Sequence, residues 1–464
     1  MRAAILLPAL FSLLILFACR KDSFITGPDA IVRVTADTLK YDTVFTQTGS
    51  VTQSFKIVNE NDKKLRLSSV KLMGGVASSY SMNVDGTAAQ EVTNIDIEAN
   101  DSVYVFVKVN IDPTIDNLPF IIRDSIKIAY NGNEKLVQLE AWGQNAHFLR
   151  GEEIEVDEVW TNDLPYVILD YLLIAENTRL IIEKGCRIYL HADAPIVVDG
   201  SLVVNGEKDS VDRVYFRGDR LDEPYRDFPA AWPGIYFTET SYDNVMSYAV
   251  IRNAYQSIGV IGPSVNANPK LVLNECIIDN SFDAGIIASN SSIDARNCLV
   301  SNCGKNIVLF RGGDYNFTHC TAASISNQFI PHRDPVLQVS NTDGLSSFPL
   351  DASFRNCIFW GENGIVENEV VADKDDAAAF NVVFEHVLWK VQTQPPNVSI
   401  VGNPPINNEN PLFDSIDVSK NFYNFRLKDN SPAIDKGVIT TVGIDLDGNP
   451  RPINLPDLGS YEHN

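Results

Sequence analysis

Positive charge is scarce in this sequence. Its 464 residues include 37 lysines and arginines against 60 aspartates and glutamates, which gives a formal net charge of −23. A surface of this sign repels phosphate groups, which disfavours nucleic acid and anionic membrane surfaces as partners, whereas cations, neutral sugars and basic proteins stay compatible. Hydrophobic residues make up 45% of the chain, beside 27 glycines and 23 prolines. This ordinary composition excludes a disordered, collagen-like or coiled-coil chain, and the length predicts two or three globular domains.

A membrane-spanning run is also missing at the start of the chain. The apolar run over residues 3–18 has only 16 residues and contains Pro8, so with Arg2 before it the run is typical of a signal peptide. Leu16-Phe17-Ala18-Cys19 resembles the bacterial lipobox, whose cysteine is acylated and becomes the first mature residue. We expect a signal peptide over 1–18, lipid attachment at Cys19, a tether over 19–30, and anchoring in the cell envelope, with the outer membrane or cell surface favoured. An ordinary signal peptide with a chance cysteine is the alternative.

Strand-like patterns without a helical run fill residues 31–148. Residues 54–58 and 124–128 alternate with period two, residues 103–109 are rich in β-branched and aromatic side chains, and turn signals such as Asn-Gly-Asn at 131–133 separate them. Several short strands over this length predict a β-sandwich. The succession of strands and turns resembles the Hydin-type immunoglobulin-like domains, which implies a spacer or binding module.

An internal repeat decides the fold predicted for the remainder of the chain. The repeats align on Ala249, Cys276, Cys298, Cys320, Cys357 and Val387, at spacings of 27, 22, 22, 37 and 30 residues. Positions −3, 0 and +2 relative to these anchors are apolar, and the two positions before each anchor are never aliphatic, which predicts a polar bend between two short inward-facing strands. Asn253, Asn280 and Asn302 recur four positions after the anchor, where asparagine tolerates a left-handed conformation. A unit of 22 residues without a helix predicts a coil of a parallel β-helix and argues against a leucine-rich repeat.

The stretch before the repeats supports the same architecture. Short strands separated by glycines over residues 180–218, followed by Trp-Pro-Gly-Ile-Tyr-Phe at 232–237, resemble the right-handed parallel β-helix, or pectate-lyase-like, superfamily. Residues 425–462 resemble the C-terminal end of bacterial surface β-helix proteins. We predict an all-β chain with an N-terminal Ig-like β-sandwich over 31–148, a right-handed parallel β-helix over 149–424 and a C-terminal β-helix cap segment over 425–464. The superfamily includes lyases, hydrolases and proteins without known activity, so the resemblance implies no particular reaction.

Four of the six cysteines after Cys19 share the inward column of anchors. Side chains stacked in coils about 4.8 Å apart point in parallel, which is poor geometry for a disulfide, and they do not converge on one point as metal ligands must. We therefore predict buried thiols that act as small hydrophobic groups. Cys186 and Cys303 lie next to turns, where either can be exposed, and a Cys298–Cys303 disulfide is an alternative. This register predicts a large destabilisation for Cys298→Asp and a small one for Asn297→Asp at an exposed bend.

Few residue types suited to catalysis fall close together. Among six histidines, His319 and His386 share the bend column but lie two coils apart, about 10 Å, so we interpret them as bend residues and not as zinc ligands. The second strand of each coil has no carboxylate, and the outer positions of the first give no compact acid pair of the glycosidase kind.

Two loops, residues 218–232 and 330–335, combine aromatic side chains with charges of both signs. Sugar sites combine flat apolar faces with forked donors and carboxylates, which makes these loops a candidate glycan site. The candidate residues are Arg220, Tyr225, Trp232, His332, Arg333 and Asp334. The alternative is that the loops fold onto the solenoid with ion pairs of their own.

Asp445, Asp447 and Asn449 have residue types that bind calcium, but the position of Gly448 and the lack of a glutamate at the EF-hand spacing indicate an Asp-Gly turn. We predict no cofactor, with calcium as the alternative. The leading hypothesis is a lipid-anchored cell-envelope protein with a non-catalytic binding or scaffold role, whose partner is a polysaccharide or another surface protein. The alternative is a polysaccharide lyase or glycoside hydrolase with its site on the coil insertions.

Overall fold

The computed structural model describes residues 23–45, 51–111, 120–452 and 455–463, so the expected signal peptide and Cys19 lie outside the described residues. The described chain is all-β, apart from the short 3-10 helices η1 (Gly75–Ala77), η2 (Tyr225–Asp227) and η3 (Val418–Lys420). It divides into two compact units, Met1–Asn145 and Ala146–Asn464. Within the described ranges, no helix has the length and apolar character needed to cross a bilayer.

The first unit consists of two sheets whose inward side chains form one core. Val103, Val105 and Val107 of β9 are buried while the alternate residues Tyr104 and Phe106 are exposed, as the period-two pattern predicts. One sheet has the order β1-β5-β10-β11-β3 with β8 on β5, and its strands are β1 (Phe24–Ile25), β3 (Thr38–Phe45), β5 (Lys64–Leu72), β8 (Glu91–Ile97), β10 (Phe120–Tyr130) and β11 (Asn133–Gln144). The other has the order β2-β4-β9-β6-β7, with β2 (Val32–Val34), β4 (Gln53–Asn59), β6 (Tyr80–Val84), β7 (Thr87–Ala88) and β9 (Ser102–Val109).

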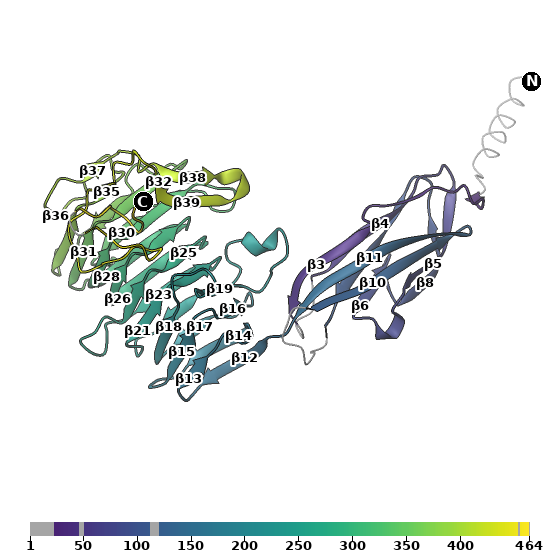
Figure 1. Cartoon of the computed structure of the whole chain (residues 1–464), viewed down its shortest axis with the longest axis horizontal. Helices are drawn as coiled ribbons and strands as arrows, with labels where there is room; N and C mark the ends of the chain where they lie inside the picture. Colours follow the sequence, from purple (N-terminus) through teal and green to yellow (C-terminus); the bar gives the residue numbers. More distant parts are fainter. Residues whose placement is uncertain (1–22, 46–50, 112–119, 453–454, 464) are drawn as a thin grey trace, which may run out of the picture. The chain divides into compact units, whose positions relative to one another are not determined.

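The second unit contains one sheet of 26 parallel strands, β12–β37 (Figure 1). Each strand pairs with the strand of the next coil, so β15 pairs with β18, β16 with β19 and β17 with β20. The pairings continue in three columns, and the long strands β26 and β28 each run through two of them. This topology is compatible with a β-helix.

The strands of the three columns have the following bounds. The sheet begins with β12 (His147–Ile154) and β14 (Tyr166–Ile174), which pair with each other. The first column contains β13 (Glu158–Trp160), β15 (Arg179–Glu183), β18 (Ser201–Asn205), β21 (Asn244–Ser247), β24 (Leu271–Asn274), the ends of β26 (Ala284–Arg296) and β28 (Lys305–Thr318), β31 (Leu350–Arg355), β34 (Phe380–Glu385) and β36 (Ser399–Val401). The second contains β16 (Arg187–Leu190), β19 (Val214–Gly218), β22 (Ala249–Arg252), β25 (Ile277–Asp279), β27 (Leu299–Ser301), β29 (Thr321–Ile325), β32 (Ile358–Glu362), β35 (Leu388–Trp389) and β37 (Ile406–Asn407). The third contains β17 (Ile196–Val198), β20 (Ile235–Phe237), β23 (Gln256–Ile261), the beginnings of β26 and β28, β30 (Leu337–Ser340) and β33 (Val370–Asp373).

The strand register confirms the repeat alignment residue by residue. At position −3, Phe317 pairs with Phe354 and Phe354 with Phe384, and their buried rings stack with centroids 5.5 and 5.0 Å apart. At position +2, the register partners run from Ile251 through Ile278, Val300, Ala322 and Phe359 to Trp389. The anchor cysteines are buried free thiols, as predicted. Cys186 and Cys303 are buried as well, at 0% and 1% exposure, so the expectation that either is exposed is wrong.

Both predicted bends have left-handed backbone. The residue before each anchor has a positive φ, and the set comprises Tyr248, Glu275, Asn297, His319, Asn356 and His386. We call these six residues the first-bend column. Asn253, Asn280 and Asn302 also have positive φ, at the second bend. His319 and His386 are therefore bend residues, and they share this conformation although histidine favours it less than asparagine.

The C-terminal residues lie against the side of the coils, which differs from an end cap (Figure 1). A hairpin of β38 (Phe413–Asp417) and β39 (Phe422–Leu427) precedes residues 428–463, which we call the C-terminal segment. Outward side chains at position +1, such as Leu299, Ile358 and Leu388, pack against apolar residues of the hairpin and the segment. The segment buries this apolar column, which would otherwise face water.

The first-bend column fastens the C-terminal segment through hydrogen bonds. The Asn356 amide donates to Val438 O at 2.7 Å and its oxygen accepts from Val438 N at 2.9 Å. The Asn297 amide donates to Ile444 O at 2.8 Å and to Glu275 Oε1 at 2.8 Å. Asn297 is 0% exposed, so the expectation of an exposed and tolerant bend is wrong, because a later part of the chain covers it.

Candidate functional site

The loop 219–231 leaves the coils at the end of β19 and returns at Trp232. Second-bend asparagines hold its backbone, because the Asn253 amide donates to Arg226 O at 2.7 Å and the Asn280 amide donates to Asp227 O at 2.9 Å. Buried or half-buried amides thus fix the loop to the coils beneath it, and its side chains have a rigid base.

Arg220 and Tyr225 form a stacked pair within this loop. The guanidinium carbon lies 3.5 Å from the centroid of the Tyr225 ring, and the guanidinium donates to both carboxylate oxygens of Asp222, at 2.9 and 3.2 Å. The forked donor expected to bind a sugar is therefore occupied by Asp222. Tyr225 itself is 42% exposed and presents ring surface to solvent.

The two loops that the sequence singled out meet in space. The Phe228 ring lies 5.2 Å from the Tyr225 ring and 5.2 Å from the ring of Phe329, which precedes the 330–335 stretch. Arg333 is exposed and Asp334 is half-buried in the second loop. The structure thus joins the loops through aromatic contacts.

Two of the expected glycan-binding residues face inward. Trp232 is 1% exposed, and its indole N–H donates to Arg252 O at 2.9 Å. His332 is 2% exposed, and its Nε2 lies 2.8 Å from Oε1 of the buried Glu369. The assignment of Trp232 and His332 to a surface site therefore needs correction, because neither ring presents a face to a ligand. Tyr225 stays available for stacking.

A second pair of exposed rings lies on the coils themselves. Tyr255 and Phe282 are 45% and 51% exposed, and they stack with centroids 5.8 Å apart and planes at 27°. Each follows a second-bend asparagine by two positions, and the same position in the next coil is Gly304. The recurrence of an aromatic residue at this repeat position was visible in the sequence and could have predicted the pair. The sequence-based prediction considered only the two loops.

Polar side chains line the neighbouring position of the same coils. Gln256 Nε2 donates to Asp283 Oδ2 at 2.7 Å, and Lys305 Nζ lies 3.1 Å from Asp283 Oδ1. Tyr236 is the register partner of Gly259 in the next coil, and burial, followed by the proximity of Tyr255 and Asp283, raises the pKa of its hydroxyl. An aromatic pair beside amide, carboxylate and ammonium groups is an arrangement that can stack on a sugar ring and bind its hydroxyls.

A histidine–carboxylate pair lies where the loop begins. His191 Nδ1 lies 2.7 Å from Asp219 Oδ2, and the two residues follow the register partners Leu190 and Gly218 of β16 and β19. The Asp219 side chain is only 13% exposed, and this burial raises the pKa of its carboxyl against the opposing effects of His191 and Arg220. A bond at Nδ1 leaves Nε2 as the outer nitrogen, which is the geometry of a general base. Sequence reasoning missed this pair, whose signal was two polar residues at equivalent positions of adjacent coils.

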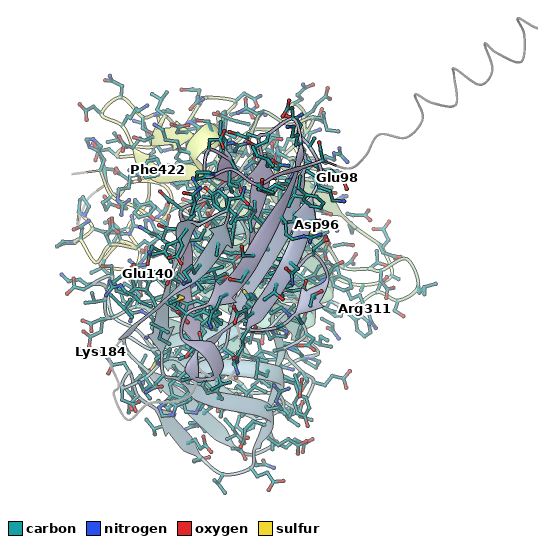
Figure 2. All side chains as sticks on the ribbon, turned by 90° about the vertical axis from the view of Figure 1, so that its right-hand side faces the viewer. Asp96, Glu98, Glu140, Lys184, Arg311 and Phe422 are labelled. Carbon is teal, nitrogen blue, oxygen red and sulfur yellow. The ribbon has the colours of Figure 1, made fainter. Side chains whose placement is uncertain are left out.

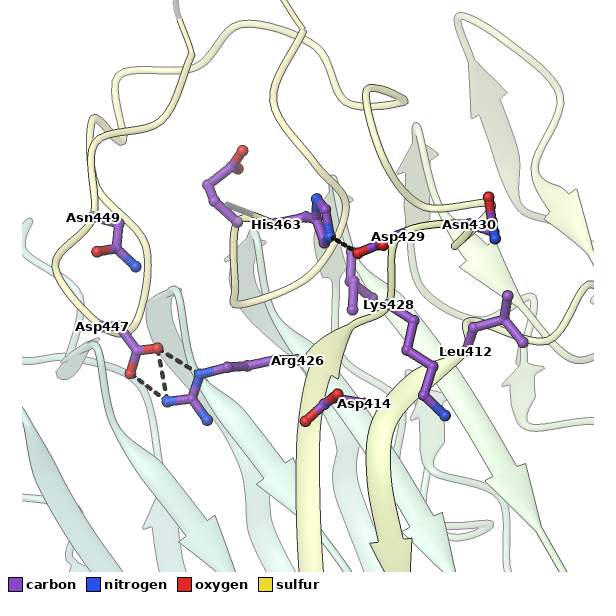
Figure 3. Close-up of a pocket in the computed structure, with 11 residues that line it drawn as sticks. Leu412, Asp414, Arg426, Lys428, Asp429, Asn430, Asp447, Asn449 and His463 are labelled. Atoms are coloured by element: carbon purple, nitrogen blue, oxygen red, sulfur yellow. Dashed lines mark hydrogen bonds and ion pairs between the residues drawn. The ribbon is translucent and has the colours of Figure 1, made fainter.

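A charged cleft of about 640 Å³ lies between the β38–β39 hairpin and the C-terminal segment (Figure 3). Two pairs lie within the cleft, Arg426 on Asp447 at 2.7 Å and His463 on Asp429 at 3.0 Å. The nearby Asp445 carboxylate accepts backbone N–H groups of Asp447, Asn449 and Glu462 at 2.9, 2.7 and 3.0 Å. These bonds make the Asp-Gly sequence a turn, and no group of three or more potential metal ligands occurs among the described residues.

Comparisons with known proteins find no family. No protein-family model and no curated protein matches the chain. Among solved structures, it is similar to a family 123 glycoside hydrolase from Clostridium perfringens at 10% identity, over 25% of this chain and 25% of that chain, with a TM-score of 0.18. The CooA pilin subunit from enterotoxigenic Escherichia coli matches at 9% identity over 25% of this chain and 97% of the pilin, with a TM-score of 0.19. The chain thus spans a quarter of the hydrolase, and likenesses of this size carry no argument about function.

Proposed function

We propose that this chain is a lipid-anchored cell-envelope protein that binds glycans without catalysing their breakdown. In this proposal an Ig-like β-sandwich separates the lipid anchor from a right-handed parallel β-helix. Two sheets around one core support the first assignment, and parallel columns with a left-handed first bend in six successive repeats support the second. The lipobox at Cys19 supports the anchor.

The exposed stack of Tyr255 and Phe282 is the observation that carries the binding role. Large apolar side chains that stay exposed side by side on a folded surface mark contact sites more often than isolated ones do. The C–H face of a sugar ring packs on such rings, and Asp283, Gln256 and Lys305 lie close enough to bind hydroxyl groups. Tyr225 supplies a further exposed ring on the neighbouring loop.

A glycan array followed by isothermal titration tests this role on the purified full chain. We expect Tyr255→Ala and Phe282→Ala each to weaken binding of any array hit by more than about 1 kcal/mol, or about fivefold in Kd. Phe422→Ala is the matched control, because Phe422 is 53% exposed on the β38–β39 hairpin (Figure 2) and should leave Kd unchanged. Equal glycan affinity in all three variants would show that the stacked pair is not part of the binding site.

The enzymatic alternative is a polysaccharide lyase or glycoside hydrolase, and His191 with Asp219 favours it. The mostly buried Asp219 carboxylate accepts a hydrogen bond of 2.7 Å from His191 Nδ1, which orients the imidazole for proton transfer. An enzyme of this kind should release unsaturated or reducing ends from a polysaccharide, and His191→Ala should abolish the release. Absence of any release with the unaltered chain would leave the binding role.

A further inference from the structure

Charged side chains around the exposed rings are already paired with one another. Lys305 lies 3.1 Å from Asp283, and Arg252 lies 3.5 Å from Asp279. In the loop, Arg220 contacts Asp222 at 2.9 Å and Arg226 contacts Glu223 at 2.6 Å. The cations nearest to the stacked pair in sequence and register therefore each have a carboxylate partner.

A charged sugar would have to break one of these pairs. A uronate or sulfate that took Lys305 would leave Asp283, which is half-buried, without its ammonium partner, and an amino sugar that took Asp283 would leave Lys305 likewise. Such an exchange replaces one ion pair by another and leaves a charge uncompensated, so it brings little net affinity. The net charge of −23 adds a long-range repulsion against polyanions.

The groups that stay free around the rings are suited to an uncharged ligand. Tyr255 and Phe282 offer exposed aromatic surface, and Gly304 continues their column without a side chain, so the row of rings ends at Phe282. A planar sugar face can pack on the two rings while its hydroxyls reach Asp283 and Gln256 without displacing Lys305. Hydroxyl groups can share the remaining lone pairs of a carboxylate that is already paired.

We infer that the stacked pair Tyr255–Phe282 takes an uncharged glycan, and that acidic and aminated glycans are not its ligands. This inference rests on the proposed glycan binding and narrows it to one chemical class. In this inference the glycan stacks on the two aromatic rings and its hydroxyl groups form hydrogen bonds, while the charged side chains of the site stay paired with each other.

Isothermal titration of the full chain with defined hexasaccharides tests the inference. The uncharged probes are the β-1,4-glucose, β-1,4-xylose, β-1,4-mannose and β-1,3-glucose hexamers, and the charged probes are hexagalacturonate and hexaglucosamine. We expect at least one uncharged hexamer to bind, with a Kd that changes less than about twofold between low and high salt, because no charge is exchanged. Phe282→Ala should weaken it at least about fivefold, and Phe422→Ala, the control on the β38–β39 hairpin, should not change it.

Two results would count against the inference in different ways. Binding of a charged hexamer alone, with a Kd that rises steeply with salt and an affinity that falls in Phe282→Ala, would overturn the uncharged class and keep the glycan-binding role. No binding by any uncharged or charged probe, on the array or in titration, would overturn both the class and the role.

Discussion

Arg451 holds the C-terminal segment to the coils, and its removal gives the sharpest test of how this unit is stabilised. Its guanidinium pairs with Glu462 and also donates to Asn297 Oδ1 at 2.8 Å, Gly459 O at 3.0 Å and Ile444 O at 3.0 Å. The side chains of Arg451 and Glu462 are 2% and 3% exposed. Arg451→Ala therefore leaves a buried carboxylate and several acceptors without their donor.

The expected loss is large because the pair is buried. Removing one partner of a buried ion pair typically costs about 3–5 kcal/mol of unfolding free energy, and the individual bonds do not add to this independently. Arg426→Ala is the matched control on the β38–β39 hairpin, since the Arg426 side chain is 47% exposed and its ion pair with Asp447 should be worth no more than about 1 kcal/mol.

Urea unfolding of both variants, with hydrogen exchange of residues 436–452, measures the difference. Arg451→Ala should lower the urea midpoint strongly and speed exchange in the C-terminal segment and around Asn297, and Arg426→Ala should do neither. The double variant Arg451→Met with Glu462→Gln should recover part of the loss, because it removes the uncompensated charge. Equal, small effects of Arg451→Ala and Arg426→Ala would refute the reasoning.

Three further predictions concern other parts of the chain. Cys298→Asp places a charge at a position of 0% exposure and should cost more than about 3 kcal/mol in urea unfolding, whereas Cys298→Ala should cost less. Burial raises the pKa of Glu462 from its usual 4.5 to about 7, so the stability this group contributes is complete below about pH 4.5 and is lost as the pH rises through about 7. Glu462→Gln should remove that part of the pH dependence of the urea midpoint, and an unchanged profile would contradict the assignment. Cys19→Ala should release the protein from membranes or block its maturation, and fractionation with membranes as before would exclude lipidation.

The sequence predicted the interior of the coils better than their surface. Position +2 is in register from Ile251 to Trp389 because the same pattern of inward apolar and outward polar side chains repeats in each coil. The surface depends on segments far along the chain, so Asn297 could not be placed without knowing that residues near 444 cover it. The apolar residues at position +1, such as Leu299 and Ile358, were a visible signal of such a cover.

The candidate site could be predicted only in part for the same reason. The aromatic and charged composition of two loops located them, and the Phe228–Phe329 contact joins them. Composition cannot tell an inward ring from an outward one, so Trp232 was placed on the surface although it is buried in the core of the second unit. Tyr255 and Phe282 were overlooked because a recurrence in only two coils is weak evidence in a single sequence.

The first bends of the coils limit how many coils the C-terminal segment can cover. Asn297 and Asn356 bind Ile444 and Val438, and His386 contacts Lys436 O at 2.9 Å, so the contacts along the C-terminal segment follow the order of the coils in reverse. An open solenoid can gain or lose a repeat and stay in register with itself. Here an inserted or deleted coil between Asn297 and His386 would move every later bend past its partner in the C-terminal segment. The number of coils in that interval is therefore fixed by a part of the chain that belongs to none of them.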